Sequence, residues 1–225
     1  MEEYYNMELK EVLNYIENDS AIKNVYKEVE EYEEKDKSWA YHNYNHVKNV
    51  MVIATNILTT LKYDNDIIIS IKIACLLHDT GARLGKENHA IRSYEFAKEY
   101  FESHNMNFKN KDIILNAIKN HSNGFDCNDI ISLTLLFSDK LDIKKNRITE
   151  AGKKVIGNRQ YTHIEDIEVN IKNKILEINF VSDKQLDIDE FKEYYFTKKV
   201  LKSIHNFASA NKLEYKVLID NIDLD

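Results

Sequence analysis

An adjacent histidine and aspartate follow directly on the longest apolar run of the chain, which extends from Ile67 to Leu77 and leads into His78-Asp79. Apolar residues at this density predict a buried helix. A charged carboxylate at the end of a buried helix costs free energy unless a cation or another partner neutralises it. The pair therefore predicts a metal site, with Asp79 as a catalytic residue.

A second apolar run also ends in a carboxylate. Ile130 to Phe137 leads into Ser138-Asp139-Lys140, and His46 lies early in another predicted helix. Because both buried helices place ionisable groups at their C-terminal ends, we expect these groups to converge with His46. Histidine and carboxylate ligands that leave one position open for water suit a hydrolytic metal ion.

Two further histidines are enough to hold a second metal ion. His89 lies near the start of the next predicted helix, and His121 ends the one after it. With Asp79 as a bridge, two metals would hold a hydroxide between them and align it for in-line attack on phosphorus. Imidazole and carboxylate ligands favour iron, manganese or zinc over calcium without choosing among the three. We therefore expect one or two divalent transition metals.

In the order of His46, His78-Asp79 and Asp139, the chain resembles the HD domain superfamily of metal-dependent phosphohydrolases over about residues 40–145. The two additional histidines resemble its six-ligand, two-metal branch. The resemblance implies a helical bundle that hydrolyses a phosphoester or phosphoanhydride of a nucleotide or similar small phosphate compound by a metal-bound hydroxide. Two alternatives stay open: a metal-stabilised sensor or scaffold that binds a nucleotide without turnover, and a diiron HD oxygenase.

The segment Tyr41-His42-Asn43-x-x-His46 is similar to the first metal motif of the cyclic-nucleotide phosphodiesterases. This similarity implies that His42 is a general acid that protonates the leaving oxygen and that His46 is a ligand. The i, i+4 spacing of the two histidines predicts a shared helix face if the helix begins early enough.

Three basic residues are predicted to contact the substrate phosphate. Many HD relatives carry a lysine three positions after the His-Asp pair, where this chain has Ala82 followed by Arg83. Charge on a transferred phosphoryl group requires fixed cations. We expect Arg83, Arg92 and Lys140 to supply them, with Lys140 also counted as catalytic.

The elements that must position these residues are mainly helical. Apolar residues recur at helical spacing through the first 160 positions, and alternation typical of strands appears only later. Helices are expected over about 4–18, 20–36, 45–62, 66–79, 87–104, 110–121, 128–143 and 189–210. A β-hairpin is expected around the Lys172-Asn173-Lys174 turn, with a third strand over 213–219. The predicted fold is an HD-type helical bundle over 1–160 with a small β-hairpin and helix appendage over 161–225.

The composition of the chain limits the classes of binding partner that we expect. A net charge of −7 and an isoelectric point near 5.7 argue against a nucleic-acid-binding surface and leave a small phosphorylated substrate, a nucleotide, as the expected partner. The acidic start of the chain and the short apolar runs predict neither a secretion signal nor a membrane span. A cytoplasmic protein is expected, and its oligomeric state stays open.

Overall fold

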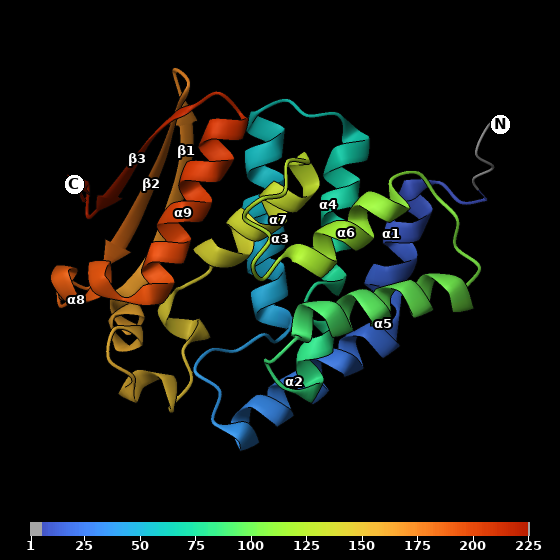
Figure 1. Cartoon of the computed structure of the whole chain (residues 1–225), viewed down its shortest axis with the longest axis horizontal. Coiled ribbons are helices and arrows are strands. Elements are labelled where there is room, and N and C mark those ends of the chain that lie inside the picture. The colour runs from blue at the N-terminus through green and yellow to red at the C-terminus, as the bar shows by residue number, and fades with distance from the viewer. Residues whose placement is uncertain (1–5, 225) are drawn as a thin grey trace.

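The two most apolar helices lie at the centre of the structure, a computed structural model that describes residues 6–224. Nearly every side chain of α7 (Ile130–Leu141) is buried, as is the stretch of α4 (Asn65–Leu77) from Ile73 onward. Helix α4 contacts α1, α3, α6 and α7, so it is surrounded by other helices (Figure 1). Such complete burial explains why these segments lack the polar face of a surface helix.

The remaining helices of the bundle wrap around this pair. They are α1 (Leu9–Asn18), α2 (Ser20–Asp36), α3 (Tyr44–Thr60), α5 (His89–Ser103) and α6 (Lys111–Asn120), with the short 3₁₀ helix η1 (Thr80–Leu84) after α4. The mainly helical fold expected from the sequence is confirmed. Positions 4 and 5 of the first expected helix lie outside the described residues.

Helix α3 begins at Tyr44 because Asn43 caps it. The Asn43 side chain accepts hydrogen bonds from the backbone N–H groups of Asn45 at 3.1 Å and His46 at 3.2 Å. A short polar side chain at this position satisfies amides that have no partner within the helix. His46 therefore stands in the first turn, whereas His42 precedes the helix. The helix therefore does not begin early enough for these two histidines to share one of its faces.

A four-stranded sheet follows the bundle in the chain. Its order is β1 (Ile164–Lys172), β2 (Ile175–Ser182), β3 (Glu214–Ile219) and β4 (Ile222–Asp223). Strands β1 and β2 form the expected antiparallel hairpin, with Asn173 and Lys174 both at positive φ in its two-residue turn. That turn matches the right-handed twist of the strands it joins. Strand β3 then pairs parallel to β2.

The single helix expected over 189–210 is wrong, because the structure contains two. Helix α8 (Ile188–Glu193) and helix α9 (Tyr195–Ala210) are separated by Tyr194, whose extended backbone has φ −65° and ψ 132°. The Tyr194 ring lies against Gly157, where an added Cβ would meet it at 2.3 Å. Tertiary packing therefore interrupts a segment whose apolar periodicity runs on without a break.

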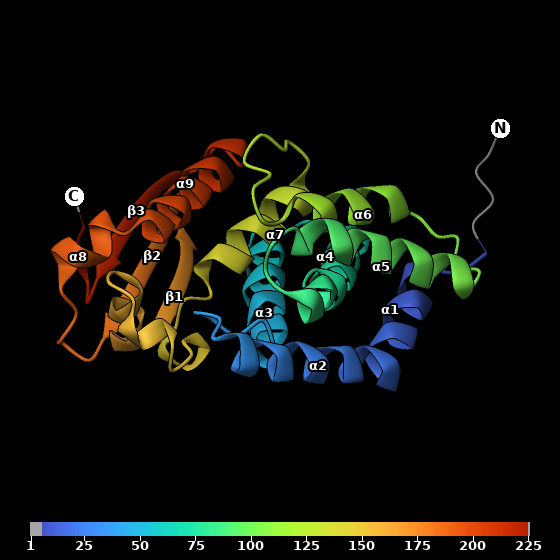
Figure 2. The same ribbon diagram turned by 60° about the horizontal axis from the view of Figure 1, so that its bottom comes forward.

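Short 3₁₀ helices connect the bundle to the sheet. They are η2 (Lys145–Arg147), η3 (Gly152–Lys154) and η4 (Asn158–His163). The sheet, α8 and α9 gather at one end of the molecule, and α2 runs along one side of the helical bundle (Figure 2). Helix α9 contacts both α7 and β3, and Phe207 stacks on Phe137 with ring centroids 4.5 Å apart. We propose that the residues after 160 form an appendage held on the bundle through this contact.

Replacing Phe207 with alanine tests that contact. The side chain is fully buried, so its loss leaves a cavity between α9 and α7 and should lower the free energy of unfolding by about 3–5 kcal/mol. Urea unfolding followed by circular dichroism measures the change. Ile222→Ala, at a residue 73% exposed, should cost less than about 0.5 kcal/mol. Equal stabilities of the two variants would contradict the prediction.

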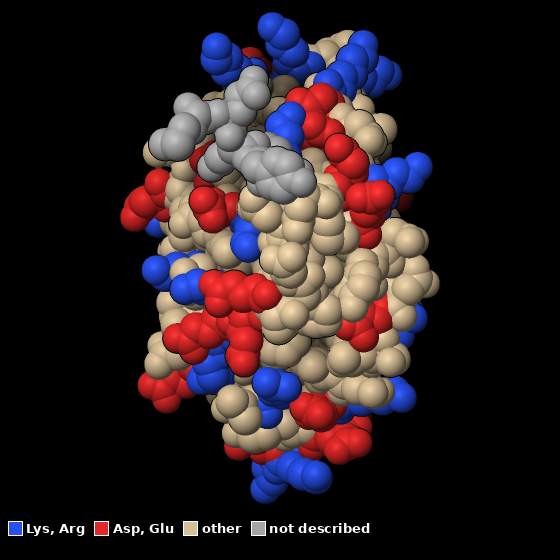
Figure 3. Space-filling view, turned by 90° about the vertical axis from the view of Figure 1, so that its right-hand side faces the viewer, with Lys and Arg blue, Asp and Glu red and all other residues tan. Residues whose placement is uncertain are grey.

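The surface carries charges of both signs. On the face at the α1 and α5 end, acidic and basic side chains are interspersed around an uncharged central area (Figure 3). Within residues 6–224, none of the helices combines the length and apolarity needed to cross a bilayer.

Candidate metal centre

All six predicted ligands come together at one place inside the bundle. Each is supplied by the end of a helix and each is buried. They are His46 in the first turn of α3, His78 and Asp79 directly after α4, His89 at the start of α5, His121 directly after α6 and Asp139 in the last turn of α7.

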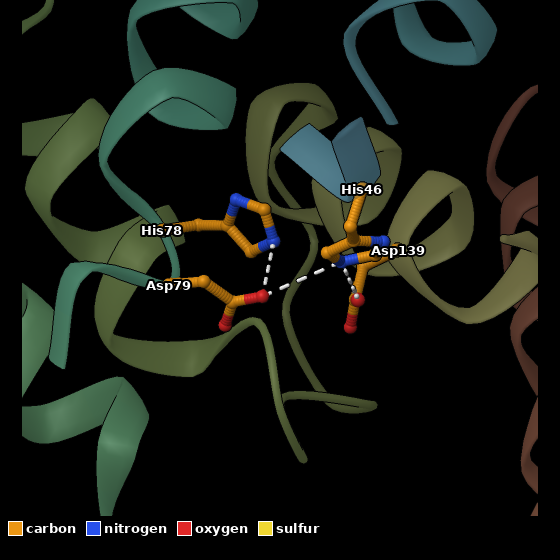
Figure 4. Close-up of side chains that lie close together, drawn as sticks. All are labelled: His46, His78, Asp79 and Asp139. Atoms are coloured by element: carbon orange, nitrogen blue, oxygen red, sulfur yellow. Dashed lines mark hydrogen bonds and ion pairs between the residues drawn. The ribbon is translucent and has the colours of Figure 1, made fainter. Parts of the chain in front are cut away.

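Asp79 lies at the middle of the cluster, and its two carboxylate oxygens face different histidines. Oδ2 is 3.1 Å from Nε2 of His78 and 3.3 Å from Nε2 of His46 (Figure 4). Oδ1 is 3.2 Å from Nε2 of His121 and 3.4 Å from Nε2 of His89. One carboxylate therefore serves two sets of potential ligands, which is the arrangement of a bridging group.

The two sets are each compact enough to enclose a cation. The first comprises His46, His78, Asp79 and Asp139, and the second Asp79, His89 and His121, with the ligand atoms of each set within 4.8 Å of one another. Asp139 joins the first set through Oδ1, 3.1 Å from Nε2 of His46. Imidazole nitrogens and carboxylate oxygens in these numbers suit a divalent transition metal.

The four histidines are oriented by hydrogen bonds from their other ring nitrogen. Nδ1 of His78 donates to the Cys75 carbonyl at 2.8 Å, and Nδ1 of His121 donates to the Ile118 carbonyl at 2.7 Å. Nδ1 of His89 likewise donates to the carbonyl of Lys86 at 2.8 Å. A carbonyl can only accept, so in the neutral form each of these rings presents a bare lone pair on Nε2.

These lone pairs lack hydrogen-bond donors, and a bound metal ion would accept them instead. Nε2 of His89 and Nε2 of His121 are 3.0 Å apart, although in their neutral forms both are acceptors. Nε2 of His78 and both carboxylate oxygens of Asp79 are buried without a hydrogen-bond partner. Unpaired buried polar atoms are costly, and facing acceptors repel one another. The donor set therefore fits one or two bound cations.

The charge states suit this interpretation. Burial would raise the pKa of Asp79, but the surrounding histidines outweigh it and hold that pKa well below its usual range. Burial lowers the pKa of His121 to about 4, which keeps its ring neutral and able to act as a ligand. Burial also opposes protonation of His46, yet its hydrogen bonds to Asp139 and Asp142 raise its pKa to about 10. A metal ion would replace that proton.

Asp142 is a member of the site that the sequence analysis missed. Its Oδ2 accepts from Nδ1 of His46 at 2.7 Å, and Asn49 donates to its Oδ1 at 3.1 Å. The carboxylate thereby orients His46 as the backbone carbonyls orient the other histidines. Its spacing of three residues from Asp139 is the one signal in the sequence that points to the same end of α7.

We expect Asp142→Asn to weaken metal binding about 10- to 100-fold, because the substitution removes the charge that supports His46 as a ligand. Competition between the protein and a chelator of known affinity measures the change. Asp126→Asn, at an exposed residue, is the matched control. An unchanged metal affinity in Asp142→Asn would refute this supporting role.

His42 lies beside the cluster, as predicted, but a second missed residue holds it. Its ring centroid is 5.9 Å from that of His46 and 5.7 Å from that of His89. Its Nδ1 contacts the buried carboxyl group of Glu33, which also accepts from the His42 backbone N–H at 2.8 Å. Burial raises the pKa of Glu33 to about 8 and lowers the pKa of His42. Near neutral pH the pair therefore keeps one proton on the carboxyl group.

Two cations adjoin Asp139. The Lys140 amino group, predicted from the sequence, lies 2.6 Å from Oδ2 of Asp139. Arg147, which was not predicted, donates to the backbone carbonyls of Asp139 at 3.1 Å and Asp142 at 2.7 Å. A third cation, Lys86, is exposed as a residue, but burial of its amino group lowers its pKa to about 8, and the charges of Arg147 and Lys140 act in the same direction.

The other two predicted phosphate contacts point elsewhere in the structure. Arg83 lies 3.6 Å from Glu28 and over the ring of Phe96. Arg92 donates to the backbone carbonyls of Gly81 and Gly85, so it braces the turn that follows Asp79. These contacts hold Arg83 beside Glu28 and Phe96 and hold Arg92 at two backbone carbonyls, so neither guanidinium is assigned to phosphate binding.

A comparison with protein-family models agrees with this geometry. The model of the HD domain family matches residues 43–149, a segment that contains all six candidate ligands. A similar solved structure is the crystal structure of a predicted HD superfamily hydrolase from an uncultured Thermotogales bacterium, with 23% sequence identity, a TM-score of 0.45, and coverage of 66% of this chain and 88% of that one. None of the curated proteins matches the chain. The ordered ligands and the family match together show that this chain carries an HD domain over residues 43–149.

Proposed function

We propose that this protein is a metal-dependent hydrolase that cleaves a phosphoester or phosphoanhydride of a nucleotide or similar small phosphate compound. The observation that carries the proposal is the position of Asp79 between two sets of buried histidines, with both of its oxygens lacking hydrogen-bond partners. The HD domain over residues 43–149 supports the hydrolytic class. The chemistry of the surrounding cations supports the choice of phosphate.

The ligands would hold one or two divalent ions of iron, manganese or zinc, which when bound supply a Lewis acid and an acidified water. The protein's own contribution is to place positive charge beside that site. Lys140 and Arg147 lie against Asp139 and are both buried, so they are held in place. Fixed cations stabilise the charge that develops on a phosphoryl group without a cost of reorganisation.

His42 and Glu33 provide a proton for the leaving group in this proposal. The carboxyl group of Glu33 protonates the adjacent His42 ring as His42 gives its proton to the leaving oxygen, a role that general acids fill by direct contact. The Glu33 carboxyl group carries this proton below its pKa of about 8 and loses it above that value. Hydrolysis should therefore decline as the pH rises through 8.

Glu33→Gln tests the proton supply. Glutamine can keep the hydrogen bond from the His42 backbone but cannot carry a proton, so we expect kcat/KM to fall about 10²- to 10⁴-fold and the decline above pH 8 to disappear. A pH profile of kcat/KM measures both effects. Glu34→Gln, at the exposed neighbouring residue, should leave the profile unchanged. If Glu33→Gln keeps the wild-type profile, the pair does not supply the proton.

The proposed function as a whole is tested by metal content and turnover. Protein purified without added metal is analysed for its elements, then loaded separately with manganese, iron, zinc, cobalt or nickel and assayed with nucleoside mono-, di- and triphosphates. We expect metal-dependent release of phosphate or pyrophosphate that a chelator stops. Tight nucleotide binding with intact nucleotide recovered would instead indicate a sensor, and oxygen consumption by the reduced iron form would indicate an oxygenase.

A further inference from the structure

A hollow rich in aromatic side chains opens next to the metal centre. It is a surface hollow that is open to solvent at its mouth. The residues that form it, called the aromatic hollow below, are Trp39, Ala40, Lys86, Ile143, Arg147, Ile148, Asn158, Tyr161, Tyr194, Tyr195 and Phe196. Most of them lie outside residues 43–149, so the hollow is formed mainly by segments that flank the HD domain.

Two side chains connect the aromatic hollow to the metal centre. Arg147 lines the hollow and also donates to the carbonyl of the candidate ligand Asp139. The Lys140 amino group lies 2.6 Å from the Asp139 carboxylate and 5.8 Å from the centre of the Phe196 ring. A ligand in the hollow would therefore lie within a few side-chain lengths of the metal ligands.

The aromatic rings of Tyr194, Tyr195 and Phe196 lie side by side and form one wall of the hollow, with Tyr161 behind them. The ring of Tyr195 is 4.8 Å from that of Tyr194 and 6.4 Å from that of Phe196, measured between centroids. Behind them the buried Tyr161 ring is 6.3 Å from that of Phe196. Trp39 and Tyr195 remain 45% and 54% exposed, so the wall is only partly used for packing.

The charged residues that line the hollow favour an anionic ligand. Among the described residues that line it, Lys86 and Arg147 are basic and none is acidic. Aromatic faces bind planar rings by stacking, and cations beside them attract an attached phosphate. Neither a purely aliphatic phosphate nor an uncharged ring would use both features.

We propose that the aromatic hollow binds the planar ring of a phosphorylated substrate, with the phosphate directed past Arg147 to the metal centre. The inference rests on the proposed function and narrows it to substrates that carry an aromatic ring. Tyr195 is the residue that determines this preference, because its ring is the most exposed part of the wall. The break between α8 and α9 at Tyr194 places it there.

Trp39 gives a direct reading of ring binding, because it is the only tryptophan of the chain and lies in the hollow. Its fluorescence is followed in the presence of a chelator, so that no turnover occurs, while adenosine 5′-monophosphate, phenyl phosphate or ribose 5-phosphate is added. We expect saturable quenching by the two compounds that have a ring and none by ribose 5-phosphate. Binding of the nucleotide alone would show that base edges are recognised as well as the ring.

Tyr195→Ala should weaken nucleotide binding about 5- to 150-fold, because stacking on an aromatic side chain is worth about 1–3 kcal/mol. In the metal-loaded enzyme the same variant should raise KM for the nucleotide and leave kcat nearly unchanged. Tyr215→Ala, at a residue of β3 that is 43% exposed and outside the hollow, is the matched control.

Wild-type affinity in Tyr195→Ala, or equal binding of ribose 5-phosphate and the nucleotide, would overturn the inference. Hydrolysis of phosphate esters without preference for a ring would do the same and leave the proposed function intact. Ring binding that is lost in Tyr195→Ala, in a protein that shows no turnover with any metal, would keep the aromatic hollow and refute the hydrolase.

Discussion

Replacing Asp79 with alanine is expected to abolish hydrolysis and to reduce bound metal at both sites. Asp79 is the one side chain that belongs to both ligand sets, with Oδ2 toward His46 and His78 and Oδ1 toward His89 and His121. Metal catalysis is worth several kcal/mol, so kcat should fall by roughly 10³-fold or more. Elemental analysis and a phosphate-release assay measure the two effects.

The control for this variant must separate loss of metal from loss of folding. Asp79→Asn keeps the shape of the side chain and removes its charge, and it should lose metal as Asp79→Ala does. Asp126→Ala, at an exposed residue, should keep both metal and activity. Retained turnover in a folded Asp79→Ala protein would refute the assignment of this residue as the centre of the site.

Replacing His121 with alanine is expected to remove one metal and keep the other. His121 belongs to the second ligand set alone, together with His89 and the shared Asp79. Metal content should therefore fall from two equivalents to one, and kcat should fall by about 10²-fold or more if both ions take part, as in other two-metal sites. His89→Ala should behave in the same way, because only three residues form this set.

His104→Ala is the matched histidine control. Nδ1 of His104 hydrogen-bonds to the Tyr100 carbonyl and the ring packs on Tyr15, and neither of these residues belongs to a ligand set. The variant should retain full metal content. A wild-type protein that binds a single equivalent, unaffected by His121→Ala, would restrict the function to a one-metal centre.

The fold could be predicted from the sequence where local patterns dictate it. The apolar segments Ile67 to Leu77 and Ile130 to Phe137 have no polar face, so only a central position satisfies them, and both occupy it. The hairpin around Asn173 was likewise predictable, because a short polar turn between alternating strands permits few other structures. The helix break at Tyr194 was not, since it arises from packing against Gly157 and not from a residue that disfavours helix.

The sequence by itself predicted which residues gather at the candidate metal centre. His78, Asp79 and Asp139 stand at the ends of helices whose burial is dictated by their composition, so their convergence follows from local information. Ordered histidines at compatible spacing then completed the set, and the structure brings all of them together.

Only the tertiary structure decided what surrounds those ligands. Glu33 reaches His42 from α2, and Arg147 reaches Asp139 from η2, through contacts between elements that no spacing along the chain encodes. The same cause directs Arg83 to Glu28 and away from the cluster. A ligand at a helix end is positioned by its own helix, whereas a supporting charge or an aromatic wall depends on which elements pack beside it, and that is a property of the whole fold.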